Sequence, residues 1–212
     1  MNIRYSHIQE SSLVDGPGKR TVFFMQGCET YCPGCQNRKL WSKDGGEEVD
    51  VILAAEVLNA VAKNRQITIS GGEPFLQPQA LAQLVLLLHV VYHCHVIVYT
   101  GFTWEQLTDL TKASYSLYDR ALTHIEFLVD GPYVKALDDN TIIYRGSRNQ
   151  RPIDVKESRK AGTPIPLDWY HPEVVIDEDG NIFLPIGLTE IGSTIGDVHS
   201  TRMCGQTAGI RR

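Results

Sequence analysis

Three cysteines, Cys28, Cys32 and Cys35, share one short run with the spacing Cys-x3-Cys-x2-Cys. Three thiolates on a single loop can converge on one soft-metal centre. A closed structural zinc site takes four ligands, and a cubane iron–sulfur cluster contains four irons. Three local cysteines therefore leave one coordination position of such a centre unclaimed. We expect a cofactor or substrate to bind at that position.

The spacing alone also permits a zinc site that is completed by a distant ligand, for which His7 or Cys204 is available. A disulfide with one spare thiol is the weaker alternative, because five cysteines are an odd number and the N-terminal residues carry no secretory leader. A reducing, cytoplasmic location is expected instead. Cys94 lies in an apolar stretch and is predicted to be a buried core thiol.

The bulk composition is that of an ordinary globular domain with one sizeable core, since 42% of the 212 residues are hydrophobic and 21% are charged. The formal net charge is −5, so no nucleic-acid partner is expected. The longest apolar stretch, residues 84–92, is interrupted by His89 and is too short to cross a bilayer. No membrane association is expected.

Strand-like and helix-like segments alternate along the chain up to residue 129. Strands are expected at 21–25, 66–70, 95–100 and 125–129. Helices are expected at 51–63 after the capping Asp50, at 78–90 opening on Pro78, and after the capping box Thr103-Trp104-Glu105-Gln106. Strands separated by helices predict βα units around a parallel sheet.

Chemically notable residues follow each expected strand, at the end where parallel sheets bind ligands. The first strand is followed by the cysteines, and the second by Gly71-Gly72-Glu73-Pro74. Two glycines let backbone approach a ligand closely, and Glu73 offers an anionic acceptor for an ammonium group. A plain βα turn is the alternative. Thr100 and Asp130 are further candidate ligand contacts, although an Asp before a Gly is often only a turn residue.

The cysteine run after the first strand and Gly-Gly-Glu-Pro after the second together resemble the radical S-adenosylmethionine (SAM) superfamily. The resemblance implies that Cys28, Cys32 and Cys35 hold a [4Fe-4S] cluster whose fourth iron is chelated by the amino and carboxylate groups of SAM. It implies that Gly71, Gly72, Glu73 and Pro74 surround the methionyl ammonium, and that the backbone of Gly34, Cys35 and Gln36 lies along the adenine. Many members carry an aromatic residue where this chain has Gly34.

Further motifs narrow the resemblance to the activases of glycyl radical enzymes. These motifs are Asp15-Gly16-Pro17-Gly18, Gln36-Asn37 with Trp41, and the segments 127–133 and 144–151. The last two are similar to the branch that activates anaerobic (class III) ribonucleoside-triphosphate reductase. That branch implies reductive SAM cleavage, a glycyl radical enzyme (the reductase large subunit) as partner, and a flavodoxin-like electron donor. Without the resemblance, Arg145, Arg148 and Arg151 would be assigned to a solvated polar loop.

The expected fold is α/β, a partial, open βα barrel, because about four βα units precede residue 135 and a closed barrel needs ~250 residues. We expect a radical SAM core at 1–152 and an extension at 153–212, with a loop at 158–172 and a β-hairpin formed by 174–176 and 182–184. Three alternative functions stay open. They are a radical SAM enzyme of the deazapurine-forming type, an activase of another glycyl radical enzyme, and a non-catalytic zinc or electron-transfer module. No side chain is assigned as a general acid or base.

Overall fold

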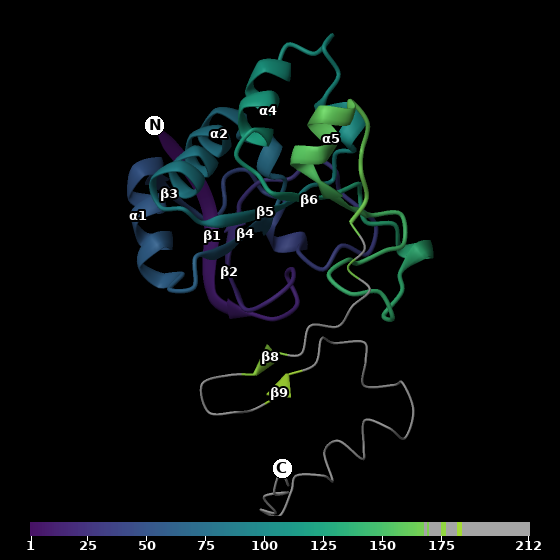
Figure 1. The fold of residues 1–212 in the computed structure, drawn as a ribbon, viewed down its shortest axis with the longest axis horizontal. Coiled ribbons are helices and arrows are strands. Elements are labelled where there is room, and N and C mark those ends of the chain that lie inside the picture. Colours follow the sequence, from purple (N-terminus) through teal and green to yellow (C-terminus); the bar gives the residue numbers. More distant parts are fainter. Residues whose placement is uncertain (168, 170–174, 177–181, 184–212) are drawn as a thin grey trace, which may run out of the picture.

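The computed structural model describes residues 1–167, 169, 175–176 and 182–183. A seven-stranded mixed sheet forms its centre, with the strand order β3-β1-β2-β4-β5-β6-β7 (Figure 1). The four central strands are parallel: β2 (Arg20–Met25), β4 (Gln66–Gly71), β5 (His95–Tyr99) and β6 (Phe127–Asp130). The antiparallel strands β1 (Asn2–Ser12) and β3 (Glu47–Asp50) extend one edge, and β7 (Arg151–Asp154) extends the other. The expected α/β class is confirmed, and the sheet is open.

Along the chain, helices lie between strands, and three of them begin where the sequence signals predicted. Helix α1 (Val51–Val61) begins at Asp50, whose side chain accepts a hydrogen bond from the backbone N–H of Ile52. Helix α2 (Pro78–Leu86) continues into the π-helical turn η3 (Leu87–Val91). Helix α3 (Trp104–Leu107) carries the reciprocal capping box of Thr103 and Gln106. Helices α4 (Tyr115–Leu122) and α5 (Val155–Ala161) complete the set in the described part of the chain.

The two faces of the sheet bury different side chains. Alternate residues of a strand point to opposite faces, and Phe23 and Met25 of β2 join the main core with α1, α2 and α4. Val22 and Phe24 instead form a small second cluster with Leu40. Cys94 is 2% exposed within the main core, which confirms the predicted buried thiol. The helices therefore cover one face and leave the other to short loops.

Three short 3-10 turns lie in the loops: η1 (Arg38–Leu40), η2 (Pro74–Leu76) and η4 (Lys135–Leu137). Strands β8 (Val175–Ile176) and β9 (Ile182–Phe183) pair antiparallel, as predicted for a β-hairpin. The residues that join these two strands, 177–181, lie outside the described residues. The loop expected from residue 158 is wrong at 158–161, which belong to α5. The boundary expected between 152 and 153 falls inside β7. Within the described residues, no helix is both long and apolar enough to cross a membrane.

Candidate functional site

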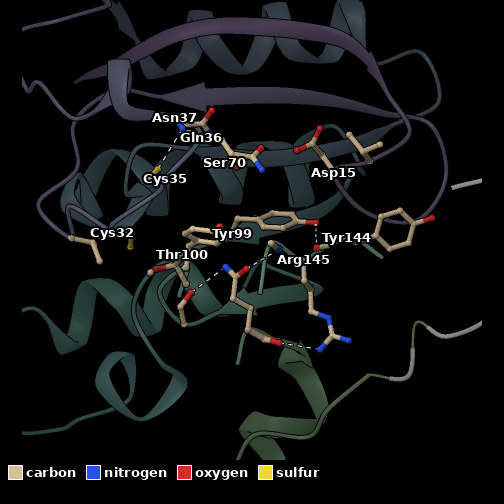
Figure 2. Close-up of a pocket in the computed structure, with 18 of the residues that line it drawn as sticks. Asp15, Cys32, Cys35, Gln36, Asn37, Ser70, Tyr99, Thr100, Tyr144 and Arg145 are labelled. Atoms are coloured by element: carbon tan, nitrogen blue, oxygen red, sulfur yellow. Dashed lines mark hydrogen bonds between the residues drawn. The ribbon is translucent and has the colours of Figure 1, made fainter. Parts of the chain in front are cut away.

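A cavity of about 460 Å³ opens where the parallel strands end (Figure 2). Five segments of the chain line it: the turn between β1 and β2, the cysteine run, the end of β4, the end of β5, and the chain that follows β6. Its lining includes Cys28, Cys32, Cys35, Gln36, Gly71, Gly72, Glu73, Thr100 and Tyr133. The structure thus brings most of the sequence-predicted residues to one site.

The cysteine loop, which we define as residues 27–41, is closed at its base by backbone hydrogen bonds. The N–H of Gly27 donates to the Leu40 carbonyl at 2.8 Å, and that of Cys28 donates to the Trp41 carbonyl at 3.0 Å. All three thiols are free and half-buried. Figure 2 shows Cys32 and Cys35 beside the cavity, with the N–H of Asn37 3.4 Å from the Cys35 sulfur. The loop therefore holds its thiols at the cavity and uses backbone for its own closure.

The surroundings of Cys32 raise the pKa of its thiol. Burial raises the pKa of Cys32, the N–H of Tyr133 opposes this, and Cys35 and Cys28 raise it further. A bound metal centre would remove that mutual repulsion by stabilising the thiolates. No three His, Cys, Asp or Glu side chains in the described residues converge on a single metal ion. Cysteines of a cubane do not need to converge, because each binds a different iron.

The zinc alternative receives little support from its proposed fourth ligands. His7 stacks on Phe24, with ring centroids 4.4 Å apart, and is not among the described residues that line the cavity. Cys204 lies outside the described residues. The donor set at the cavity is three thiols with a shared opening beside them, which fits an iron–sulfur cluster with one open position.

The two glycines at the end of β4 are required by close contacts, of Gly71 with β2 and of Gly72 with the cysteine loop. A Cβ on Gly72 would lie 2.2 Å from the Gly27 carbonyl oxygen, and one on Gly71 would lie 2.5 Å from the Met25 backbone. The N–H of Glu73 donates to the same Gly27 carbonyl at 2.8 Å. Only glycine permits this approach. The contact fixes Glu73 relative to the cysteines.

Glu73 is a buried carboxylate with three donors around it, and it is only 2% exposed. Its Oε1 accepts from the Phe75 N–H and the Thr100 hydroxyl, and its Oε2 accepts from the Gly101 N–H at 2.7 Å. Burial raises its pKa to about 7, against these hydrogen bonds. A carboxylate offers about four acceptor positions, so Oε2 retains one for a ligand.

The remaining predicted contacts divide into two groups. Thr100 and Gln36 line the cavity, and Thr100 also orients Glu73. Gly34, Pro74 and Asp130 are not among the described residues that line it. Asp130 is fully buried, and it accepts hydrogen bonds from Arg151 and from the Trp104 N–H at the start of α3. It anchors the chain after β6 through these bonds.

The arginine loop, which we define as residues 131–151, is held together by its own side chains. The Oε1 atom of Gln150 accepts from the N–H groups of Gly146 and Ser147, and its Nε2 donates to the Gly131 carbonyl. Arg145 donates to the Gln150 carbonyl at 3.0 Å, and its buried Nε has no hydrogen-bond partner. The polar residues of this motif therefore build the loop.

Tyr133 is a cavity residue that sequence reasoning did not predict for the site. It belongs to the arginine loop, yet its ring reaches the cysteine loop at Gly34. Gly34 has φ +84°, and a Cβ there would lie 3.3 Å from the Tyr133 ring and 3.1 Å from Lys135. The absence of an aromatic residue at position 34 thus has a steric reason. No local sequence signal indicated this contact, since it joins residues far apart in the chain.

Comparison with known proteins identifies the family. The model of the 4Fe-4S single cluster domain family matches residues 14–153. Anaerobic ribonucleoside-triphosphate reductase-activating proteins from Salmonella typhimurium and Escherichia coli are 32% and 31% identical over 156 residues. Each alignment covers 70% of this chain and 96% of the relative. The chain belongs to this activating-protein family.

Membership extends beyond bacterial sequences. The anaerobic ribonucleoside-triphosphate reductase-activating protein of Enterobacteria phage T4 is 29% identical over 155 residues, covering 70% of this chain and 92% of the phage protein. The crystal structure of QueE from Escherichia coli aligns with 49% of this chain and 54% of its own, at 19% identity and a TM-score of 0.39. That likeness is too distant to bear on function.

Proposed function

We propose that the chain is a radical SAM activase that generates a glycyl radical on anaerobic ribonucleoside-triphosphate reductase. One observation carries the proposal: three free thiols and the Gly71-Gly72-Glu73 turn line the same cavity, with a direct backbone contact between the two. The family membership supports the choice of the reductase as the partner.

The residues have separate tasks in this proposal. Cys28, Cys32 and Cys35 hold the [4Fe-4S] cluster. Glu73 accepts the SAM ammonium through its remaining Oε2 position, while Thr100 holds the carboxylate in place. The backbone of Gly34, Cys35 and Gln36 lies along the adenine. When bound, the cluster supplies one electron, so that SAM and the glycine Cα–H yield methionine, 5′-deoxyadenosine and a glycyl radical.

The finer points of the proposal follow from the same site. The four parallel strands form part of an open radical SAM barrel, and the core extends from residue 1 to the end of β7 at Asp154. A flavodoxin-like protein supplies the electron. The glycine donor reaches the cavity from outside, because the sheet is open. Asp130 and Pro74 are buried next to residues of the site, and we assign them a supporting role there.

The test is anaerobic incubation of the reconstituted protein with SAM, a reductant and the class III reductase of the same organism. The expected result is an electron paramagnetic resonance doublet from a glycyl radical on the reductase, and this doublet should vanish with Cys32→Ala. SAM cleavage without that doublet, together with conversion of a purine precursor, would instead indicate the small-molecule reaction.

A further inference from the structure

Tyr133 is a cavity residue for which the proposed function has no task. It lines the cavity together with Cys32 and Cys35, and it is half-buried. Its backbone lies beside the Cys32 thiol, and its hydroxyl lies near the Asp138 carboxylate. The residue therefore lies at the cysteine end of the cavity.

Two glycines border opposite edges of this ring. A Cβ on Gly34 would lie 3.3 Å from Cε1 of Tyr133, and a Cβ on Gly146 would lie 3.1 Å from its Cδ2. Cε1 and Cδ2 belong to opposite edges of a phenol ring. Because one glycine comes from each loop, the ring lies between the backbones of the two loops. The lack of side chains at positions 34 and 146 gives the ring its place at the cavity.

The other aromatic residues that line the cavity, within the described part of the chain, are already engaged. Trp41 meets the Tyr31 ring at 5.3 Å, and Tyr144 meets the Trp169 ring at 5.6 Å. The Tyr99 hydroxyl donates to the Tyr144 carbonyl at 2.8 Å (Figure 2). Tyr133 is the aromatic ring that the arginine loop places against the cysteine loop at Gly34.

We propose that the Tyr133 ring is the surface on which the adenine of SAM stacks. The inference rests on the proposed function, because it requires SAM in this cavity. With the ammonium at Glu73 and the cluster at the three cysteines, the proposed function places the adenine along the backbone of Gly34, Cys35 and Gln36, and the Tyr133 ring borders that backbone at Gly34. Stacking on an aromatic ring is the usual way in which proteins hold a purine.

The experiment measures binding of three ligands to the anaerobically reconstituted holoenzyme by equilibrium dialysis: SAM, 5′-deoxyadenosine and methionine. Tyr133→Ala should weaken SAM and 5′-deoxyadenosine by about 5- to 150-fold, the loss typical of one stacked base, and leave methionine unchanged. Tyr133→Phe should keep wild-type affinity for all three, because it retains the ring. Tyr31→Ala is the matched control, as this exposed ring of the cysteine loop lies outside the cavity lining.

Wild-type affinity of Tyr133→Ala for 5′-deoxyadenosine would overturn the assignment, and so would an equal loss of methionine. If Tyr133→Ala does not retain the cluster, Tyr133→Leu keeps apolar bulk without a ring and should show the same selective loss. A wild-type holoenzyme that does not bind SAM at all would contradict the proposed function. Unchanged binding by the variant alongside normal wild-type binding would contradict only the role of Tyr133.

Discussion

The cysteine loop and the arginine loop border one cavity but are stabilised in different ways. The cysteine loop is closed by backbone hydrogen bonds at Gly27 and Cys28, and its three thiols remain free. In the arginine loop, side chains such as Gln150 bind the backbone of the same loop. Because the base of the cysteine loop is closed by backbone hydrogen bonds, its three thiols remain available to a ligand. The polar side chains of the other loop maintain a wall of the cavity.

The largest expected effect comes from a thiol of the cysteine loop. Cys32→Ala should abolish bound iron and sulfide after anaerobic reconstitution, because its thiol has no substitute in the described part of the site. Iron and sulfide analysis measures the effect. Cys94→Ala is the matched control, since Cys94 is a core thiol away from the cavity, and it should retain the cluster. A normal cluster in Cys32→Ala, or loss of the cluster in Cys94→Ala, would contradict the claim that the thiols of the cysteine loop hold the cluster.

In the arginine loop the largest expected effect is on folding. Arg151 pairs with Asp130, which is fully buried, and with Glu105, whose pKa it lowers to about 2. Breaking a buried pair costs ~3–5 kcal/mol, and because Arg151 is 38% exposed we expect Arg151→Met to cost about 2–3 kcal/mol. Urea unfolding of the cluster-free protein measures this.

Arg148→Met is the control for that measurement, because the same residue type stands three positions earlier at the surface. Arg148 is 71% exposed and pairs with Asp139. The Asp139 side chain is 10% exposed, but the N–H and hydroxyl of Thr141 still donate to it when Arg148 is removed, so Arg148→Met should shift the urea midpoint less than Arg151→Met does. Equal shifts of the urea midpoint in Arg151→Met and Arg148→Met would show that the position of the arginine in the loop does not decide the loss of stability.

The expected effect of changing Glu73 is on SAM affinity, and it is smaller than the loss of the cluster in Cys32→Ala. Glu73→Gln should lower SAM affinity by about 10- to 100-fold, through loss of a charge-assisted hydrogen bond worth ~1.5–3 kcal/mol. Calorimetric titration of SAM into the reconstituted variant checks this. Glu47→Gln, at an exposed glutamate of β3, should leave the affinity unchanged. Wild-type affinity in Glu73→Gln would remove Glu73 from the SAM site.

The same variant predicts a change in pH dependence. The folded chain raises the pKa of Glu73 from 4.5 to about 7, so between these values it holds a proton that the unfolded chain has lost. The free energy of unfolding should therefore fall as pH rises through this window. Glu73→Gln should flatten that fall, and urea unfolding of the cluster-free protein at several pH values measures it. An unchanged slope would show that Glu73 does not titrate there.

Sequence patterns predicted the central strands because parallel strands are buried on both faces and read as apolar β-branched runs, as at Val22 and Ile67. They missed β1, β3 and β7, which all carry many polar residues, and of which β3 and β7 form the two edges of the sheet. The cysteines are a local motif and were found from their spacing alone. Asp130 was assigned to the ligand because a strand-end Asp looks the same whether it binds a ligand or an arginine. Only the fold, which pairs β6 with β7, puts Arg151 beside it.

The smallest expected effect is at Gly34, where the two loops meet. Gly34→Ala forces a side chain into a conformation with φ +84° and moves the flexible end of Lys135, so we expect a loss of about 1 kcal/mol in unfolding free energy. The Tyr133 ring must also shift by a few tenths of an ångström, which should weaken SAM binding by less than about 10-fold. Urea unfolding and SAM titration measure the two effects separately. Gly162→Ala is the control, because it has φ +69° with open space around it and should lose stability without losing SAM affinity. Equal SAM affinity in both variants would mean that the contact between the loops does not shape the cavity.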